Sequence, residues 1–468
     1  MRQPISYLFL CVTLISCAGG QKNRLELLDR YMQGQVQHNR FNGNILVAEG
    51  GKIIFQKSYG VRDFRSGQPL NDSSVFMLAS ASKQFTAAGI LLLENQGKLD
   101  VQDSLSKYFP ELPYKVTLHH LLTHTSGLPD YEFVLAQKWN KINVANNNDV
   151  IALLASEKLP LNFRPGTRWE YSNTGYVLLA SVIEKVSGVN YADFLTASIF
   201  APLGMAHTGV FNPRTSQAAL ENYAFGFVRS GDSYVLPDSL PAYDFVRYEA
   251  GVVGDGSLSS TTGDLYRWDR ALEDKTLLAA GVIEKMTAPH ALSDTTANVS
   301  YGYGFFVGLN QLGSYVSHPG YWPGYETSFA KYKEGDRTIV VLSNNEVPAR
   351  FIQAGLANLL FGRPVELPYA HKVVPADSLA LNAFAGTFTF NGWFFELVPR
   401  GDTVFQSFGP GYGRVYLPES DMRVFPIDGQ DILFEIEKTN AEVKHYVVVH
   451  GVREEMKEIA KKDQSARQ

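Results

Sequence analysis

The chain has 468 residues, 45% of them hydrophobic, which is long enough to bury a large core in one or more domains. Its formal net charge of −5 at pH 7 and its pI of about 6.1 exclude a basic nucleic-acid-binding protein. The aromatic content of 12% and the lack of low-complexity tracts exclude a disordered one.

The first predicted element is an export signal. Arg2 leads into the apolar run ISYLFLCVTLI at 5–15, which is too short to span a bilayer as a mature helix. We expect a lipoprotein-type signal peptide over residues 1–16, with Cys17 as the lipidated first residue of the mature chain. An ordinary secretory signal cut near Ala18 is the alternative. We therefore expect an exported protein, a periplasmic or outer-membrane (cell-envelope) lipoprotein that touches the membrane only through this anchor.

Cysteine chemistry is confined to this segment. The only two cysteines are Cys11 and Cys17. The folded part therefore has no disulfide, no thiol nucleophile and no thiolate metal site. We expect no cofactor.

The body of the chain shows strand patterns, then helical patterns, then strand patterns again. Residues 40–60 predict a hairpin, and residues 81–96 predict a helix that ends before Gly97. Helical patterns dominate from about 115 to 290, and strand patterns return between 302 and 345. We expect an α/β (α+β) domain, in which both chain ends build one antiparallel sheet flanked by helices and an all-helical lobe is inserted.

The composition changes after about residue 365. Residues 363–380 predict a linker with a short helix. Over 381–460, short strand patterns alternate with turns such as Asn391-Gly392, which predicts a small all-β barrel or sandwich. This part carries no cluster of histidines or carboxylates with an evident chemical plan, so we expect an accessory domain.

The stretch FMLASASKQFTAAGI at 76–90 places a lysine in an apolar run, where burial is costly without a partner. Ser80 and Lys83 are three residues apart and share one face of a helix. A serine hydroxyl becomes a nucleophile when a base takes its proton, and a lysine whose charge is disfavoured by burial can be that base. Alone, the spacing equally fits a helix cap and a lysine that reaches solvent.

A second motif, Tyr171-Ser172-Asn173, precedes the apolar helical pattern that runs to residue 184. A tyrosine near an ammonium can relay a proton, and an asparagine amide can orient a substrate carbonyl or amide. For the helix, Asn173 or Thr174 is the expected N-cap. By themselves these residues also fit a packed aromatic and a simple cap.

The third motif lies in SYVSHPGYWPG at 314–324. On a strand, His318 and Gly320 face the same side, and Gly320 lets a substrate backbone approach closely. The backbone N–H of Tyr321 can share an oxyanion hole with that of Ser80. Because Pro319 donates no ladder hydrogen bond, we expect an edge strand here. A lone histidine is otherwise usually structural.

The motifs S-x-x-K, Y-x-N and H-x-G, in this order, resemble the serine β-lactamase and penicillin-binding-protein superfamily, in particular its class C β-lactamase-like branch. The resemblance covers roughly residues 25–362 and includes the blocks LLTHTSGLPDY (121–131), PLGMAHTGV (202–210) and VGDGSLSSTTGDLYRWDRAL (253–272). It implies a serine hydrolase domain, followed by the accessory β domain.

The resemblance also implies roles for individual residues. Ser80 is then the acylated nucleophile, Lys83 its partner in proton transfer, and Tyr171 the general base or relay. Which of Lys83 and Tyr171 takes the first proton stays open, because the two titrate as a coupled pair. Substrate binding falls to Asn173, His318, Gly320 and Tyr321.

The third motif departs from the family, whose β-lactamases have Lys-Thr-Gly where this chain has His-Pro-Gly. His318 is only partly charged at neutral pH, and Pro319 offers no donor. Losing a charge-assisted contact costs about 1.5–3 kcal/mol, which weakens recognition of a substrate carboxylate at least about tenfold. We therefore expect a hydrolase of small esters, D-amino-acid peptides or related cell-wall-like compounds, acting through a Ser80 acyl-enzyme. A β-lactamase, or a DD-carboxypeptidase or penicillin-binding protein, is the alternative.

Two further functions are less favoured. His120 and His124 have the i, i+4 spacing of a zinc pair, but the glutamate of H-E-x-x-H and a third ligand are missing. No metal is expected, since Asp255, Asp264 and Asp269 also lack metal-loop spacing. A silent binding or sensor module on the same fold is disfavoured because all three motifs are intact. The expected partner is a small-molecule or peptide substrate and no nucleic acid, and the sequence does not indicate an oligomeric state.

Overall fold

The computed structural model describes residues 9–459, apart from 217–219, 232, 296, 391–392, 410–411, 428–431 and 440–441. Side chains are described from residue 23 onward, except those of 393 and 412. The chain forms two compact units. One is Phe41–Gln353, and the other combines the residues up to Arg40 with those from Ala354 onward. The boundary between the two units, after Gln353, lies before the linker that the sequence predicts at 363–380.

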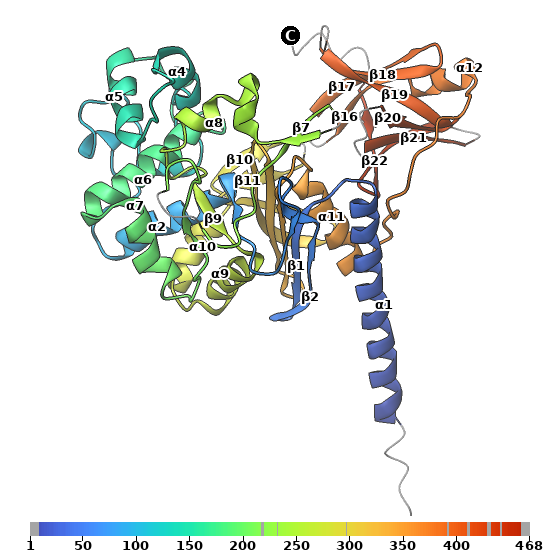
Figure 1. Ribbon diagram of the computed structural model, residues 1–468, viewed down its shortest axis with the longest axis horizontal. Helices are drawn as coiled ribbons and strands as arrows, with labels where there is room; N and C mark the ends of the chain where they lie inside the picture. The colour runs from blue at the N-terminus through green and yellow to red at the C-terminus, as the bar shows by residue number, and fades with distance from the viewer. Residues whose placement is uncertain are drawn as a thin grey trace, which may run out of the picture. The chain divides into compact units, whose positions relative to one another are not determined.

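An eight-stranded antiparallel sheet is the centre of the Phe41–Gln353 unit (Figure 1). Its order is β10-β11-β12-β13-β14-β15-β1-β2. β1 pairs with β2 on one side and with β15 on the other, so both ends of this unit build one sheet, as predicted. The strands are β1 (Gly43–Glu49), β2 (Lys52–Tyr59), β10 (Ala291–Asp294), β11 (Val299–Tyr301), β12 (Phe306–Asn310), β13 (Gly313–Trp322), β14 (Tyr325–Tyr332) and β15 (Arg337–Ser343).

The prediction that Pro319 marks an edge strand is wrong, because β13 lies between β12 and β14. The pairing with β12 ends at Ser317, however, whereas the pairing with β14 continues to Trp322. Pro319 therefore lies where the ladder is present on one side only. A residue without an N–H is tolerated at such a position even in an interior strand.

Helices pack on the sheet and form the predicted lobe. α9 packs on β1 and β15, while α6 packs against α2, α3, α5 and α7. Figure 1 shows α4 to α7 gathered in the lobe beside the sheet. The helices of this unit include α2 (Lys83–Asn95), α3 (Leu118–Leu122), α4 (Tyr131–Lys138), α5 (Asn147–Glu157), α6 (Asn173–Ser187), α7 (Tyr191–Leu195), α8 (Phe245–Tyr248), α9 (Thr262–Asp274) and α10 (Ala280–Thr287).

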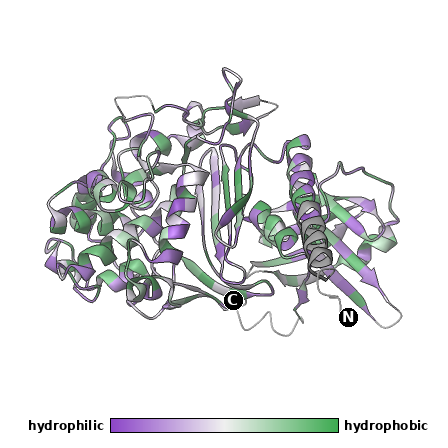
Figure 2. Ribbon diagram, turned by 90° about the horizontal axis from the view of Figure 1, so that it is seen from below, coloured by the Kyte–Doolittle hydropathy of each residue, from purple (hydrophilic) through white to green (hydrophobic). Residues whose placement is uncertain are grey.

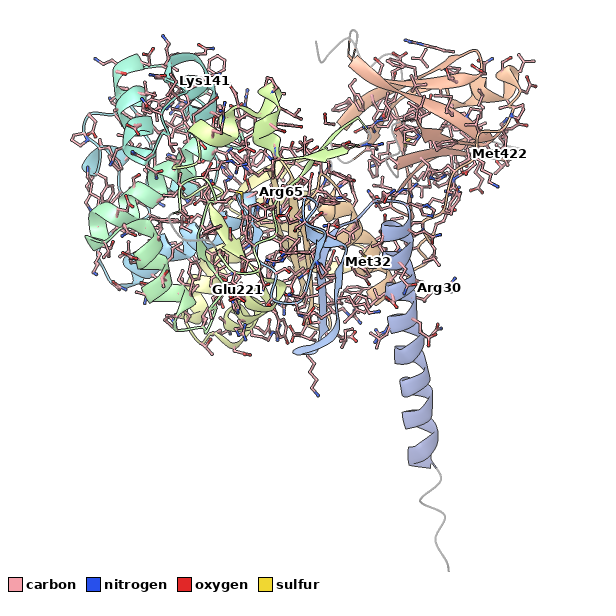
Figure 3. The ribbon with its side chains drawn as sticks, viewed as in Figure 1. Arg30, Met32, Arg65, Lys141, Glu221 and Met422 are labelled. Atoms are coloured by element: carbon pink, nitrogen blue, oxygen red, sulfur yellow. The ribbon has the colours of Figure 1, made fainter. Side chains whose placement is uncertain are left out.

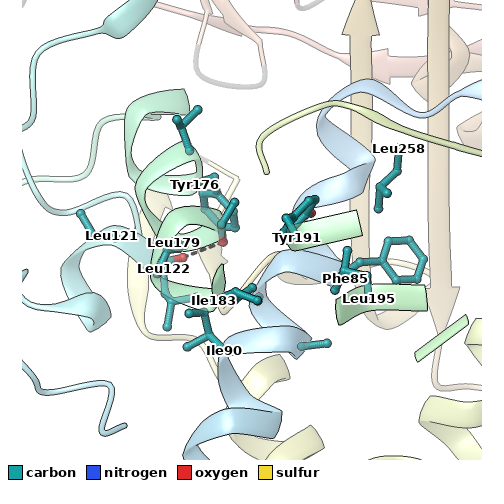
Figure 4. Packing of buried hydrophobic residues seen from close by; sticks show 14 of the residues in the cluster. Phe85, Ile90, Leu121, Leu122, Tyr176, Leu179, Ile183, Tyr191, Leu195 and Leu258 are labelled. Carbon is teal, nitrogen blue, oxygen red and sulfur yellow. Dashed lines mark hydrogen bonds between the residues drawn. The ribbon is translucent and has the colours of Figure 1, made fainter. Parts of the chain in front are cut away.

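The main core surrounds α2 (Figure 4). Phe85 and Ile90 of α2 are fully buried, as are Ile183 of α6 and Leu195 of α7. Burying a side chain of this size contributes about 1.5–3 kcal/mol. At the edge of this packing, the Tyr176 hydroxyl donates to the Leu122 carbonyl at 3.0 Å. The helix that carries Lys83 is thus anchored on several sides.

Hydrophobic segments, green in Figure 2, run through the central strands, in agreement with the near-complete burial of β14 and β15. On the surface, Lys141, labelled in Figure 3, forms an ion pair with Asp244 at 3.2 Å. Strands that are buried on both faces hold a defined register. Because β13 pairs with the buried β14 from Tyr315 to Trp322, its C-terminal half is held in register by that strand.

The second unit contains the predicted barrel. Its nine-stranded antiparallel sheet has the order β23-β22-β21-β20-β19-β18-β17-β16-β24. The two outermost strands are consecutive in the chain, so the sheet is nearly closed. The strands are β16 (Gly386–Phe390), β17 (Trp393–Arg400), β18 (Thr403–Gly409), β19 (Tyr412–Ser420), β20 (Arg423–Pro426), β21 (Ile432–Lys438), β22 (Val443–Val449), β23 (Val452–Glu455) and β24 (Lys457–Glu458).

Helix α1 (Phe9–Gln37) belongs to this second unit. Tyr31 is fully buried, and its hydroxyl donates to the His450 carbonyl at 3.1 Å. Residues 1–8 of the expected signal peptide and the side chain of Cys17 lie outside the described residues. In the part of the chain that the structure describes, every helix is too short or too polar to span a bilayer.

Candidate active site

Ser80 lies in the 3₁₀ turn η1 (Ala79–Ser82), which leads directly into α2. The residue before it, Ala79, has a φ of +49°. This left-handed conformation is unfavourable for a residue with a Cβ, and such strain is concentrated at functional sites. Ser80 lines a cavity of about 60 Å³. The turn therefore presents the serine to a small open space.

Lys83 is 0% exposed, and its ammonium group has three hydrogen-bond acceptors. Lys83 Nζ donates to Ser80 Oγ at 3.1 Å, to Asn173 Oδ1 at 2.8 Å and to the Asp255 carbonyl at 2.8 Å. An ammonium group has three donors, so each donor is used. All three acceptors are formally neutral. Lys83 is thus a buried amino group held by three dipoles against the serine, and not a lysine that reaches solvent.

Asn173 connects this lysine to a carboxyl group. Its Nδ2 donates to Glu132 Oε1 at 2.8 Å, while its Oδ1 accepts from Lys83. The predicted N-cap of α6 was Asn173 or Thr174, and this is wrong: Ser172 is the N-cap and accepts from the Gly175 N–H. Because Ser172 satisfies the helix terminus, the Asn173 amide is free to join the site.

Tyr171 lies beside the lysine. Lys83 Nζ is 4.9 Å from the centroid of the Tyr171 ring. The Tyr171 hydroxyl is buried and has no hydrogen-bond partner among the described residues. Its ring packs against His124 in a tilted arrangement, with 4.3 Å between centroids and 34° between the ring planes. His124 Nδ1 accepts from the Ser172 N–H at 3.1 Å, which fixes the histidine on the segment that carries Tyr171.

His318 is 1% exposed and does not line the cavity. Its Nδ1 donates to the Pro319 carbonyl at 2.6 Å, and its Nε2 lies 2.9 Å from the Tyr301 hydroxyl. Burial, together with the positive charge of Lys83, lowers the pKa of His318 to about 3. At neutral pH this residue is therefore an uncharged side chain packed behind the site.

Gly320 and Tyr321 follow on β13. A Cβ on Gly320 would lie 2.1 Å from the Leu78 carbonyl oxygen, so the close neighbour of this glycine is the protein's own backbone. Thr327 Oγ1 donates to that same carbonyl at 2.8 Å. Tyr321 lines the cavity and is 54% exposed. The glycine thus allows β13 to lie against the segment that leads to Ser80.

Sequence reasoning did not place the acidic residues Glu132, Glu249 and Asp255 in the cavity, and it considered Asp255 only as a metal ligand. Asp255 Oδ2 accepts from the Tyr131 hydroxyl at 3.0 Å. Burial raises the pKa of all three carboxyl groups, to about 7 for Glu132 and to about 9 for Glu249. Repulsion from nearby carboxylates adds to both shifts: Asp130 and Asp255 raise the pKa of Glu132, and Glu132 and Asp255 raise that of Glu249. The sequence around Glu249, RYEAG at 247–251, does not indicate that the glutamate is buried. This part of the site could therefore be identified only from the structure.

The zinc alternative finds no support. His120 caps α3, where its Nδ1 accepts from the Thr117 N–H at 3.1 Å, and His124 is fully buried at Ser172. The described residues contain no group of three or more side chains arranged to hold a metal ion. Asp264 and Asp269 instead form ion pairs with Arg267 and Arg270.

The chain is similar in sequence and in fold to several known proteins. The family model described as Beta-lactamase matches residues 27–361. The chain is 36% identical over 416 residues to "Penicillin-binding protein 4*" of Bacillus subtilis, which covers 86% of this chain and 92% of that protein. It is 27% identical over 337 residues to "Teichoic acid D-alanine hydrolase" of Staphylococcus aureus, covering 69% and 76%. A solved octameric penicillin-binding protein homologue from Pyrococcus abyssi matches 92% of this chain and 99% of its own, with a TM-score of 0.67 and 25% identity.

Proposed function

The chain belongs to the beta-lactamase family of serine hydrolases, and on this premise we propose that Ser80 forms an acyl-enzyme with ester or amide substrates of the D-aminoacyl type. The observation that carries the proposal is the contact between Lys83 Nζ and Ser80 Oγ at 3.1 Å, made by a lysine with 0% exposure. A buried lysine amino group beside a serine hydroxyl is the arrangement that proton transfer from the hydroxyl requires, with the neutral amine as the acceptor.

The reaction has two halves. Ser80 Oγ attacks the substrate carbonyl carbon, its proton passes to the Lys83–Tyr171 pair, and the carbonyl oxygen becomes an oxyanion. The backbone N–H groups of Ser80 and Tyr321 are the proposed donors to that oxyanion. When the tetrahedral intermediate collapses, the bond to the alcohol or amine breaks and the leaving group takes up the proton. Water then attacks the acyl-enzyme in the same way and releases the acid and free Ser80.

Asn173 and His318 have different roles in this proposal. Asn173 accepts from Lys83 and donates to Glu132, so it orders the lysine and the acidic wall together. His318 acts as a positioning residue, because its ring contacts the aromatic layer around Tyr171 (6.3 Å between centroids) and not the cavity. An uncharged His318 and a proline after it leave no cation at this point for a substrate carboxylate.

This charge distribution favours D-aminoacyl esters and amides over β-lactams. The relative named teichoic acid D-alanine hydrolase supports the same substrate class. The test is a panel of short esters, D-amino-acid amides, D-alanyl-D-alanine peptides, penicillins and cephalosporins on the wild type and Ser80→Ala. We expect hydrolysis of esters or D-amino-acid amides that is lost in Ser80→Ala. Much faster turnover of penicillins and cephalosporins would overturn the preference.

A penicillin-binding protein or DD-carboxypeptidase is the second candidate, because a relative with 36% identity bears that name. The same panel separates the two, since a DD-carboxypeptidase releases the terminal D-alanine of D-alanyl-D-alanine peptides and forms a long-lived penicilloyl adduct on Ser80. A non-catalytic sensor would form no adduct with any ester or fluorophosphonate.

We also propose that Cys17 carries a lipid anchor and that the protein works in the cell envelope. The support is the sequence LISCAGG after the apolar run, together with relatives named for cell-wall-related substrates. Mass spectrometry of the mature N-terminus tests this. A diacylglyceryl adduct on Cys17, absent in Cys17→Ser, supports the anchor, whereas an unmodified N-terminus at Ala18 or beyond excludes it.

A further inference from the structure

The wall of the cavity beside Ser80 is acidic. Glu132, Glu249 and Asp255 line it together with Ser80 and Asn173. None of the described residues that line it is a lysine or an arginine. Lys83 is fully buried behind the serine and directs its donors to Ser80, Asn173 and the Asp255 carbonyl. The carboxyl groups of the wall therefore have no basic side chain facing them across the cavity.

Among these three carboxyl groups, Glu249 is the one whose hydrogen bonding is least complete. It is 5% exposed and follows α8 directly. Its Oε2 is buried and has no hydrogen-bond partner among the described residues. A buried carboxyl without a partner is destabilising, and burial together with the nearby Glu132 and Asp255 raises its pKa to about 9. A buried carboxyl that lacks a hydrogen-bond partner and lines a cavity indicates that a ligand from solution binds there.

Glu132 is connected to the nucleophile through hydrogen bonds. Its Oε1 accepts from Asn173 at 2.8 Å, Asn173 Oδ1 accepts from Lys83 at 2.8 Å, and Lys83 donates to Ser80 at 3.1 Å. The acidic wall and the reacting hydroxyl are thus parts of one ordered network. A ligand group bound at Glu132 lies close to the carbonyl that Ser80 attacks.

The cavity limits the size of this group. Its volume of about 60 Å³ has room for a few water molecules or a group of similar size. A primary ammonium is compact and offers three donors, which match carboxylate oxygens. Its charge would also shift the buried carboxyls back to their ionised form, with hydrogen bonds about twice as strong as those between neutral groups.

We propose that Glu132 and Glu249 form a subsite for the free ammonium group of a small aminoacyl ester or amide whose carbonyl Ser80 attacks. This deepens the proposed function and depends on it for the position of the carbonyl. The subsite selects substrates with an unblocked amino group next to the acyl carbon, and it disfavours the same acyl groups when they are N-acylated.

The test measures binding without turnover, in the full chain carrying Ser80→Ala. D-Alaninamide, which has the ammonium, is titrated against D-lactamide, which has a hydroxyl in its place and nearly the same size. Ligand-observed NMR gives both dissociation constants. We expect D-alaninamide to bind at least about tenfold more tightly, as a charge-assisted contact implies. In Ser80→Ala/Glu249→Gln the preference should fall to within about twofold.

The controls separate a local from a general charge effect. Glu111→Gln, on an exposed residue outside the cavity, changes the net charge equally and should keep the tenfold preference. Glu132→Gln provides a second variant if Glu249→Gln does not fold, and it should also lose the preference. Equal binding of the two amides to Ser80→Ala, or a preference that survives both glutamine variants, would overturn the subsite.

Two experimental outcomes distinguish an error in the subsite from an error in the proposed function. A fluorophosphonate adduct on Ser80 with no preference for the ammonium overturns the subsite alone. An ammonium preference in Ser80→Ala without any adduct on Ser80 in the wild type keeps the subsite as a binding site and overturns the acyl-enzyme.

Discussion

Lys83 Nζ donates to Ser80 Oγ at 3.1 Å from a side chain that is fully buried. Two further acceptors, Asn173 Oδ1 and the Asp255 carbonyl, hold the ammonium in this position. Burial makes the charged form costly, while the three dipoles offset part of that cost. The lysine is therefore ordered and close to the Ser80 hydroxyl, whose proton it accepts when its amine is neutral, which gives the first prediction.

Lys83→Met keeps the length of the side chain and removes the charge and all three donors. We expect kcat to fall about 10²–10⁴-fold, the usual effect of removing a general base. The free energy of unfolding should not fall in proportion, since an apolar side chain suits this buried position better than an ammonium. Ester hydrolysis and urea denaturation of the same preparation measure both. Loss of activity that is matched by loss of folding would contradict a chemical role.

Tyr171→Phe tests the second member of the proposed proton-transfer pair. Its hydroxyl is buried without a partner among the described residues, so removing it breaks no hydrogen bond there. We expect kcat to fall by about 10²–10⁴-fold, while the thermal midpoint stays the same or rises. Steady-state kinetics and a melting curve check this. A purely structural Tyr171 predicts wild-type kcat, and that outcome would remove the tyrosine from the mechanism.

Gly320→Ala tests the close approach of β13 to the nucleophile. The new Cβ would lie 2.1 Å from the Leu78 carbonyl oxygen, which belongs to backbone that cannot yield easily. We expect a loss of about 1–3 kcal/mol or more in the free energy of unfolding, together with a loss of activity. Gly281→Ala is the matched control, because a Cβ at this exposed helical position meets nothing within 4 Å. It should leave stability within about 1 kcal/mol of the wild type or raise it.

His318 predicts a dependence of stability on pH. Its pKa is lowered from 6.5 to about 3 in the folded chain, so between these values the unfolded state binds the extra proton and the folded state does not. The free energy of unfolding is therefore fully retained above pH 6.5 and falls as the pH drops toward 3. One histidine contributes a slope of at most about 1.4 kcal/mol per pH unit.

The check is urea denaturation of the wild type and His318→Gln between pH 7 and pH 4. The variant should lose less stability over this range than the wild type, although other buried groups such as His124 keep part of the slope. Parallel curves for the two proteins would mean that His318 takes up its proton as readily in the folded chain as in the unfolded one.

Local spacing placed Ser80 and Lys83 on one helix face, because residues three apart on a helix lie close together. That the two residues act together was predicted only from the order of all three motifs and the family resemblance. The hairpin of β1 and β2 and the barrel pattern were predictable from local spacing, since alternation and turn residues act over short distances. The accessory domain and the joining of both chain ends in one sheet followed from the order of these patterns.

Contacts between distant segments were not predictable in this way. Ser172, Asn173 and Thr174 are all good caps, and only the position of Lys83 and Glu132 decides that Ser172 is the one used. Pro319 indicated an edge strand. The sequence does not show that the pairing of β13 with β12 ends at Ser317, which is what allows a proline here in an interior strand. Glu249 looked like a surface glutamate, and only the folded chain brings it to the cavity of Ser80.

In the proposed mechanism, Ser80 is an activated nucleophile. Its most direct test is labelling of the intact protein with a fluorophosphonate, followed by peptide mass spectrometry. We expect one adduct per chain, on the peptide that contains Ser80, which is absent in Ser80→Ala and formed much more slowly in Lys83→Met. Equal labelling of Ser80→Ala and the wild type, or a wild-type protein that stays unlabelled, would contradict it.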